Sequence, residues 1–283
     1  MGGAGSLAWA IGARAQPIEA LFHQGLIFVR VGLTDTKGGR LSGLFLLDTG
    51  AQATVIDSRL AAAARLALGS ALSLSTPGGA APARRTGGVT LQLSGGPSAQ
   101  VNAVVTDLSQ TARAMGLPLA GVLGVDFLAR FVVRLDYRAG ALSLTAPSGS
   151  SPPGLGAPIR FDDLPYVAAR ARRGDQIAQG SFQIDTGSNT AVEFWAPFAA
   201  AAFPGVRGAP GEGVGVGGLD ATLRGRIDAL EVAGRAIADL TVNFADQAKP
   251  TDAGTDYAGV IGGPAWAGLA LTLDFPARHL ALD

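Results

Sequence analysis

Cysteine is absent from the 283 residues, and histidine occurs only twice, as His23 and His279. The lack of cysteine excludes disulfides, thiolate nucleophiles and cysteine-ligated zinc. Neither histidine has a second histidine at helical spacing, so a histidine-based zinc site is not expected. A Ser-His-Asp hydrolase would also need a G-x-S-x-G turn, which does not occur. Carboxylates are the catalytic groups that remain, and we expect no metal and no cofactor.

Basic clusters and long apolar runs are also missing. The 22 Lys and Arg balance the 22 Asp and Glu, and a chain without a basic patch is not expected to bind nucleic acid. No uninterrupted apolar run reaches about 18 residues, so no membrane span is expected. Residues 1–16 end in Ala13-Arg14-Ala15 before Gln16, which fits a signal-peptidase site. We therefore expect export to the periplasm or the medium. The alternative is an Ala/Gly-rich tail on a cytoplasmic protein.

Three short motifs each occur twice, in the same order. They are Leu46–Gly50 and Gln183–Gly187, Gly121–Gly124 and Gly259–Gly262, and Leu135–Tyr137 and Leu273–Phe275. The second copy follows the first by 137 residues for the first motif and by 138 for the other two. Because three separate motifs keep one phase, the sequence predicts an internal duplication. Residues 148–157, rich in Pro, Ser and Gly, are the expected linker between lobes 17–147 and 158–283.

Each half contains short apolar or alternating segments between Gly, Pro and Asp turns, which is typical of β-strands. In the first half these segments are 26–33, 41–47, 89–93, 101–105, 131–135 and 141–144. One helix is expected over Arg59–Leu68, with Asp57-Ser58 as its N-cap and Gly69 after it, and Ala196–Phe203 is its counterpart. The expected fold class is all-β, mainly β with short helices, in two barrel-like lobes related by a pseudo-two-fold axis.

The Asp-Thr-Gly triplet is the chemically informative part of the first motif. In each copy an apolar strand leads to the aspartate, Asp48 or Asp185. The glycine after it lets backbone N–H groups approach the carboxylate. Two such turns facing each other would bring two carboxyls together, and like charges that close share a single proton. One carboxyl can then act as a general base on water while the other acts as a general acid.

These residues resemble the aspartic peptidases of the retropepsin and pepsin type. Phe45–Ala51 followed by Thr54-Val55-Ile56 is similar to the retroviral active-site loop, and Gly121–Leu128 resembles the second retroviral signature. Retroviral enzymes pair two identical chains, whereas pepsins pair two lobes of one chain. The resemblance, which covers residues 20–283, implies an aspartic endopeptidase that binds its polypeptide substrate extended and is a monomer with an intramolecular pseudo-dimer.

The resemblance implies a role for each motif residue. Asp48 and Asp185 would be the catalytic pair. The active-site loops would be supported by Thr49, Gly50, Ala51, Thr186, Gly187 and Ser188. Because the Ser188 hydroxyl, unlike Ala51, can hydrogen-bond a carboxylate, we expect Asp185 to be the more acidic partner and Asp48 to carry the proton.

A peptidase of this kind needs a cover that closes over the substrate. Glycine pairs about 30 residues after each aspartate, Gly78-Gly79 and Gly217-Gly218, are the expected tips of two β-hairpin flaps that bind substrate. Ordinary Gly-rich loops are the alternative. Gly213-x-Gly215-x-x-Gly218 matches a dinucleotide fingerprint by letter, but it follows a loop and precedes a strand, so nucleotide binding is not expected.

Two further aspartates and two other functions are compatible with the sequence. Asp136 and Asp274 recur in phase and are interpreted as turn residues that pair with nearby arginines. The chain could also be a catalytically silent peptide-binding module of the same fold, although both Asp-Thr-Gly triplets are intact. Alternatively, each triplet could pair with its own copy in a homodimer, which a tandem repeat makes less economical.

Overall fold

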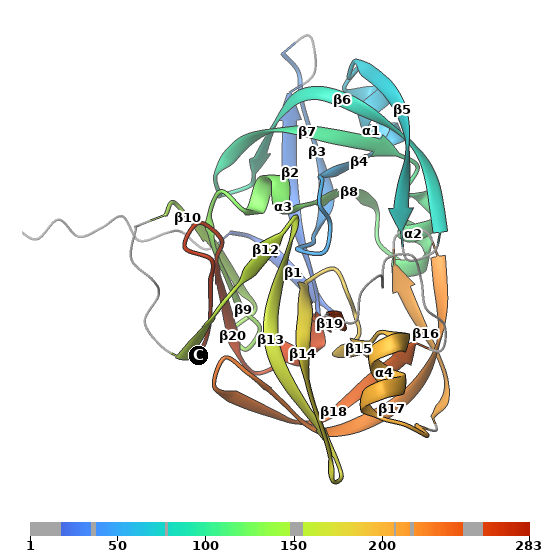
Figure 1. The fold of residues 1–283 in the computed structure, drawn as a ribbon. Coiled ribbons are helices and arrows are strands. Elements are labelled where there is room, and N and C mark those ends of the chain that lie inside the picture. Colours follow the sequence, from blue (N-terminus) through green and yellow to red (C-terminus); the bar gives the residue numbers. More distant parts are fainter. Residues whose placement is uncertain are drawn as a thin grey trace, which may run out of the picture.

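The computed structural model describes residues 18–34, 38–76, 79–147, 155–206, 208–215, 218–245 and 257–283. Over these ranges the chain is mainly β with short helices, and it forms two lobes (Figure 1). The expected fold class is confirmed. Residues 1–16, where the signal peptide is expected, and most of the expected linker lie outside the described residues.

The first lobe is built on an eight-stranded sheet with the order β1-β2-β3-β8-β4-β7-β6-β5. A further pairing of β2 with β6 curls this sheet into a barrel-like form. The strands are β1 (Ala20–His23), β2 (Leu26–Thr34), β3 (Arg40–Leu47), β4 (Val55–Asp57), β5 (Leu68–Thr76), β6 (Gly79–Leu93), β7 (Ser98–Thr106) and β8 (Leu119–Leu123). The short helices α1 (Ser58–Ala63), α2 (Ser109–Met115) and α3 (Val125–Leu128) accompany the sheet.

Helix α1 begins where the sequence predicts but ends earlier. The Asp57 side chain accepts a hydrogen bond from the Arg59 N–H at 3.0 Å, as an N-cap does. The expected end at Leu68 is wrong, because the helix stops at Ala63 and Arg65 adopts a left-handed φ of 54°. Leu68, the expected last residue of the helix, instead begins β5 and pairs with Thr86 on β6, so long-range strand pairing overrides the local helix preference there.

The second lobe has a second eight-stranded sheet with the order β12-β13-β14-β19-β15-β18-β17-β16. Its strands are β12 (Arg160–Asp162), β13 (Leu164–Arg173), β14 (Gln176–Asp185), β15 (Val192–Phe194), β16 (Ala209–Gly215), β17 (Gly218–Val232), β18 (Arg235–Ala245) and β19 (Tyr257–Gly262). Helix α4 (Ala196–Ala202) and the 3-10 helix η2 (Gly263–Trp266) belong to this lobe. Position by position, this strand order repeats that of the first lobe, including the extra pairing, here between β13 and β17.

A third sheet joins the two lobes. Its order is β10-β9-β20-β21-β11, with β9 (Val132–Asp136), β10 (Ala141–Thr145), β11 (Leu155–Pro158), β20 (Ala270–Asp274) and β21 (His279–Leu282). Its central pair, β9 with β20, takes one strand from each half of the chain. β11 lies largely within the expected linker and pairs with β21.

The two aspartates that recur in phase are the last residues of β9 and β20, and each accepts hydrogen bonds from the turn that follows it. Asp136 accepts backbone hydrogen bonds from Arg138 and Ala139 and lies 3.6 Å from the Arg138 guanidinium. Asp274 accepts one from the Ala277 N–H at 2.9 Å. Both aspartates therefore have structural partners.

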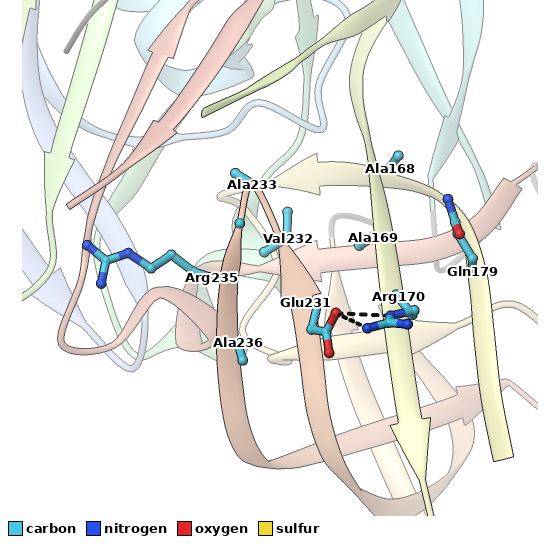
Figure 2. A pocket seen from close by; sticks show the side chains of 10 residues that line it. Ala168, Ala169, Arg170, Gln179, Glu231, Val232, Ala233, Arg235 and Ala236 are labelled. Carbon is cyan, nitrogen blue, oxygen red and sulfur yellow. Dashed lines mark hydrogen bonds and ion pairs between the residues drawn. The ribbon is translucent and has the colours of Figure 1, made fainter. Parts of the chain in front are cut away.

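A surface pocket of about 450 Å³ lies in the second lobe where β13, β17 and β18 come together. Figure 2 shows Arg170 on β13 and Glu231 on the paired strand β17 pointing toward each other, and they form an ion pair. Neither Asp48 nor Asp185 is among the residues that line this pocket. It is therefore separate from the Asp-Thr-Gly turns.

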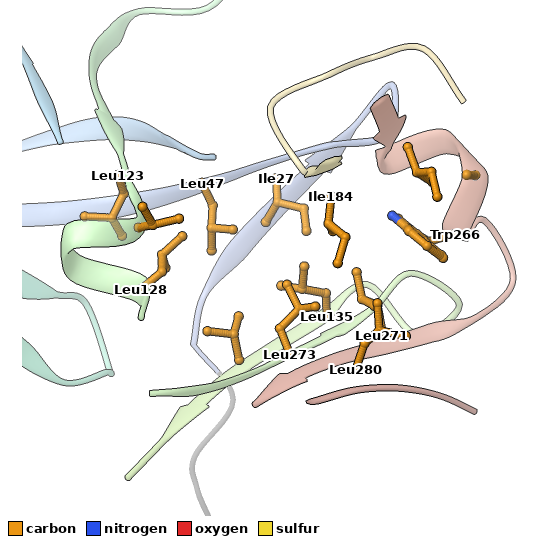
Figure 3. Packing of buried hydrophobic residues seen from close by; sticks show 14 of the residues in the cluster. Ile27, Leu47, Leu123, Leu128, Leu135, Ile184, Trp266, Leu271, Leu273 and Leu280 are labelled. Carbon is orange, nitrogen blue, oxygen red and sulfur yellow. The ribbon is translucent and has the colours of Figure 1, made fainter. Parts of the chain in front are cut away.

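One continuous apolar core runs through both lobes and the joining sheet. In Figure 3 Leu47 and Leu123 of the first lobe, Ile184 of the second, and Leu135 and Leu273 of the joining sheet lie in the same packed layer, and all are fully buried. Leu47 and Ile184 directly precede the two aspartates. The strand ends that carry the aspartates are therefore anchored in a shared, close-packed interior.

Candidate active site

Strands β3 and β14 carry Asp48 and Asp185 to equivalent positions. Each strand pairs in parallel with the strand of the second signature, β3 with β8 and β14 with β19. The Asp48 N–H donates to the Leu123 carbonyl at 3.0 Å, and Asp185 lies beside Gly262 in the β14–β19 register. The end of each strand is therefore fixed by its neighbour, and this pairing fixes the backbone position of the aspartate.

The turn after each aspartate has the same geometry. The Gly50 N–H donates to Oδ1 of Asp48 at 2.7 Å, and the Gly187 N–H donates to Oδ1 of Asp185 at 2.8 Å. The next residue closes the turn by donating its N–H to the aspartate carbonyl, at 3.4 Å for Ala51 and 3.2 Å for Ser188. Each carboxyl is thus oriented by its own loop through charge-assisted hydrogen bonds.

The two carboxyls meet across the boundary between the lobes. A methyl group placed on Gly50 would collide with the carboxyl of Asp185, and one placed on Gly187 would collide with that of Asp48. Each glycine is therefore needed for the close approach of the opposite carboxyl, and the two carboxyls lie close enough to influence each other's pKa. Both aspartates stay partly exposed, so small molecules can reach the pair.

Burial raises the pKa of Asp48 well above its ordinary value of 3.8, and the neighbouring Asp185 raises it further. Burial also raises the pKa of Asp185, but its hydrogen bonds with Asp48 and with the N–H groups of Gly187 and Ser188 act in the opposite direction. Two carboxyls this close share one proton. The balance of these effects favours Asp48 as its carrier, and the proton's position stays a prediction.

The Ser188 hydroxyl is engaged away from the pair. Its oxygen accepts a hydrogen bond from the Thr190 N–H at 3.3 Å, and the contribution of Ser188 to Asp185 comes from its backbone N–H. Among the described hydrogen bonds, none joins the hydroxyl to the Asp185 carboxylate. The difference in acidity between the two aspartates therefore has a different origin from the one that the sequence suggested.

Thr49 and Thr186 lock the two turns together below the carboxyls. The N–H of each threonine donates to the hydroxyl of the other, both at 3.1 Å. The Thr49 hydroxyl donates to the Ile184 carbonyl at 2.7 Å, and the Thr186 hydroxyl donates to the Leu47 carbonyl at 2.9 Å. Both threonines are fully buried, so these four bonds across the lobes lie in a low-dielectric interior where leaving one unmade is costly.

The second signature supports each loop from behind, through a glycine. A methyl group on Gly124 would collide with the backbone of Ala51 and Ala53, and one on Gly262 would collide with the backbone of Ser188 and Thr190. Only a residue without a side chain allows the two backbones to pack this closely.

The first lobe has an additional support that the motif comparison missed. The buried Thr54 donates both its N–H and its hydroxyl to Oδ1 of Asp126, at 2.9 Å and 2.6 Å. The second lobe has Gly263-Pro264 in the place of Val125-Asp126. The only signal in the sequence is this difference between the two copies, and it does not name Thr54 as the partner.

The expected flap glycines lie at the ends of two hairpins. β5 pairs with β6 up to Thr76 and Gly79, and β16 pairs with β17 up to Gly215 and Gly218. Gly79 and Gly218 begin the second strand of each hairpin, whereas Gly78 and Gly217 lie outside the described residues. In Figure 1 the two hairpins point toward each other along one side of the molecule. Their role as flaps stays a prediction.

The described residues lack the features of a membrane-spanning helix and of a metal site. None of the helices they form is long and apolar enough to span a membrane. Within the same ranges, no group of three or more His, Cys, Asp or Glu side chains is placed to hold a metal ion.

Comparisons with known proteins agree with this geometry. Residues 35–127 match the family model described as aspartyl protease, and they include Asp48 and all but the last residue of the second signature of the first lobe. No curated protein matches the chain. Among solved structures, the chain is similar to the aspartic proteinase from Irpex lacteus, with a TM-score of 0.57 and 13% identity over 94% of this chain and 96% of that one.

The fold is therefore that of an aspartic proteinase over nearly the whole chain, and the first lobe carries the aspartyl protease sequence pattern. The resemblance to retropepsin- and pepsin-like aspartic peptidases is confirmed.

Proposed function

We propose that the protein is an aspartic endopeptidase in which Asp48 and Asp185 activate water for peptide-bond hydrolysis. The observation that supports this most strongly is the meeting of the two carboxyls, each held by the N–H of its own loop and packed against the glycine of the other. Desolvation and mutual proximity raise the pKa of Asp48, as a shared proton requires. No metal or cofactor takes part.

The chemistry follows from one proton on two carboxyls. Asp185, unprotonated, accepts a proton from a water molecule as its oxygen attacks the scissile carbonyl carbon. Asp48 donates its proton to the carbonyl oxygen, which gives a neutral tetrahedral intermediate. When the C–N bond breaks, a carboxyl proton passes to the leaving nitrogen. The other carboxyl takes a proton from one hydroxyl as the carbonyl forms again, and the products are an acid and an amine.

The remaining expectations form part of the same proposal. An internal duplication accounts for two sheets of equal strand order, with lobes 17–147 and 158–283 on either side of a linker. The β5–β6 and β16–β17 hairpins are proposed to cover an extended peptide substrate. Because both turns are in one chain and already face each other, a monomer suffices for activity. Export, with cleavage before Gln16 that removes residues 1–15, is also proposed.

Cleavage of an unstructured polypeptide between about pH 3 and pH 7 tests the proposed chemistry. The parent protein should cleave it, a statine-type mimic of the tetrahedral intermediate should block cleavage, and Asp48→Asn and Asp185→Asn should each abolish it while remaining folded. Asp175→Asn is the matched control, because Asp175 is exposed in the β13–β14 turn. Undiminished cleavage by either dyad variant would eliminate the mechanism. Binding of the peptide without cleavage by the parent protein would favour the silent module.

A further inference from the structure

The two lobes place different chemistry at one equivalent position beside the dyad. Leu46 lies two residues before Asp48 on β3, and Gln183 lies two residues before Asp185 on β14. Because strand side chains alternate between faces, Leu46 points to the same side of its sheet as Asp48, and Gln183 to the same side as Asp185. The distance between such neighbours along a strand is roughly 6–7 Å, about the spacing of two residues in an extended peptide.

In the first lobe this face of the sheet is apolar. Leu46 is opposite Phe28 on β2 and beside Val122 on β8, and Val122 is opposite Val55 on β4. These four side chains are buried in one cluster, which includes Leu108 next to helix α2.

In the second lobe the same register positions are polar. Gln183 is opposite Tyr166 on β13 and beside Val260 on β19, and Val260 is opposite Glu193 on β15. Asn243 on β18 is next to Glu193, where the first lobe has Val104 next to Val55. Around the second aspartate, Gln183, Tyr166 and Glu193 thus occupy the positions that Leu46, Phe28 and Val55 occupy around the first. Only the valine of the second signature is the same in both lobes, as Val122 on β8 and Val260 on β19.

The amide of Gln183 is an unusual group in this setting. The residue is only 8% exposed, and among the described residues no side chain or backbone group makes a hydrogen bond with its amide. Neither amide atom is among the fully buried atoms that lack a partner, so the small exposed part of Gln183 includes the amide. An amide at such a partly enclosed position exchanges water for a polar group of a bound peptide at little cost, and it is left unpaired when an apolar side chain covers it, so it contributes to discrimination between substrates. Its position on the Asp185 side of the dyad makes a bound peptide the natural source of that partner.

We propose that Gln183 determines substrate specificity. Its amide hydrogen-bonds a polar, uncharged side chain that flanks the scissile bond on the Asp185 side, and an apolar side chain is preferred on the Asp48 side, beside the cluster that holds Leu46. This inference rests on the proposed peptidase function. The preferred substrate class is therefore an asymmetric pair, one apolar and one amide or hydroxyl side chain on opposite sides of the bond.

The test uses four peptides that differ only at the two residues around one cleavable bond: Leu-Leu, Leu-Gln, Gln-Leu and Gln-Gln. The parent protein should cleave one of the two mixed peptides with a kcat/KM about tenfold above that for Leu-Leu, as expected for one hydrogen bond. Gln183→Leu should reverse this ranking and make Leu-Leu the better substrate. The pH profile should stay that of the parent, because the dyad is unchanged.

Two controls separate folding and general effects from specificity. Gln183→Leu reproduces the residue of the first lobe and removes an unpartnered amide, so its melting temperature should not fall. Gln179→Leu changes an exposed glutamine on the same strand, six residues before Asp185, and should keep the parent ranking. If parent and Gln183→Leu rank the four peptides alike, the specificity inference is overturned while the peptidase proposal stands. If the parent cleaves none of these peptides and no unstructured polypeptide, the proposed function fails first.

Discussion

The threonine lock between the lobes gives the sharpest prediction for stability. Thr49→Val keeps the shape of the side chain but removes the hydroxyl that accepts from the Thr186 N–H and donates to the Ile184 carbonyl. The Thr186 N–H and the Ile184 carbonyl then lie in a fully buried interior, where no other group replaces the lost hydrogen bonds. Thr49→Ser makes the opposite change, because it keeps the hydroxyl and removes only a methyl group.

The magnitudes follow from this difference. Each buried backbone group left without its hydrogen bond costs about 1–3 kcal/mol, so Thr49→Val should lower the free energy of unfolding by about 2–6 kcal/mol. The loss of one methyl group in Thr49→Ser should cost only about 1 kcal/mol. Thr49→Val should therefore lower the free energy of unfolding more than Thr49→Ser does. A purely apolar packing site would show the reverse order.

Urea denaturation followed by circular dichroism measures both changes, with the slope of the unfolding curve checked for two-state behaviour. Thr90→Val on the exposed side of β6 is the matched control and should stay within about 0.5 kcal/mol of the parent. A Thr49→Val variant as stable as Thr49→Ser would refute the argument, because the bonds across the lobes would then contribute no net stability.

Two further predictions concern the carboxyl pair. Because the folded chain keeps the Asp48 proton at pH values above 3.8, where the unfolded chain loses it, the free energy of unfolding should fall as pH rises through the interval above 3.8. Asp48→Asn should therefore be more stable than the parent at pH 7 and nearly equal to it at pH 3, by denaturant titration. An equal difference at both pH values would contradict the raised pKa. Gly50→Ala and Gly187→Ala should each abolish peptide cleavage, because the added methyl group meets the opposite carboxyl, whereas Gly87→Ala, with open space around it, should keep parent activity. Activity retained in the first two variants would show that the carboxyls do not need this close approach.

Much of the site could be predicted from the sequence because its geometry is local. Asp48 follows an apolar strand and precedes a glycine, and two residues suffice to bring the Gly50 N–H to the carboxyl. The same holds for Asp185 and for the Asp57 cap of helix α1. The in-phase recurrence of these short patterns indicated a two-lobed β-fold before any contact between the lobes was known.

Contacts between distant residues were decided only by the tertiary structure. Thr54 and Asp126 are 72 residues apart, and neither has a local feature that selects the other. β9 and β20 pair across the two halves, and Leu68, the expected last residue of a helix, begins strand β5 instead. Strand partners are chosen by register and by the burial of a shared face, and a linear pattern contains neither. For the same reason the polar face around Gln183 could be recognised only after the strand registers had aligned it with the apolar face around Leu46.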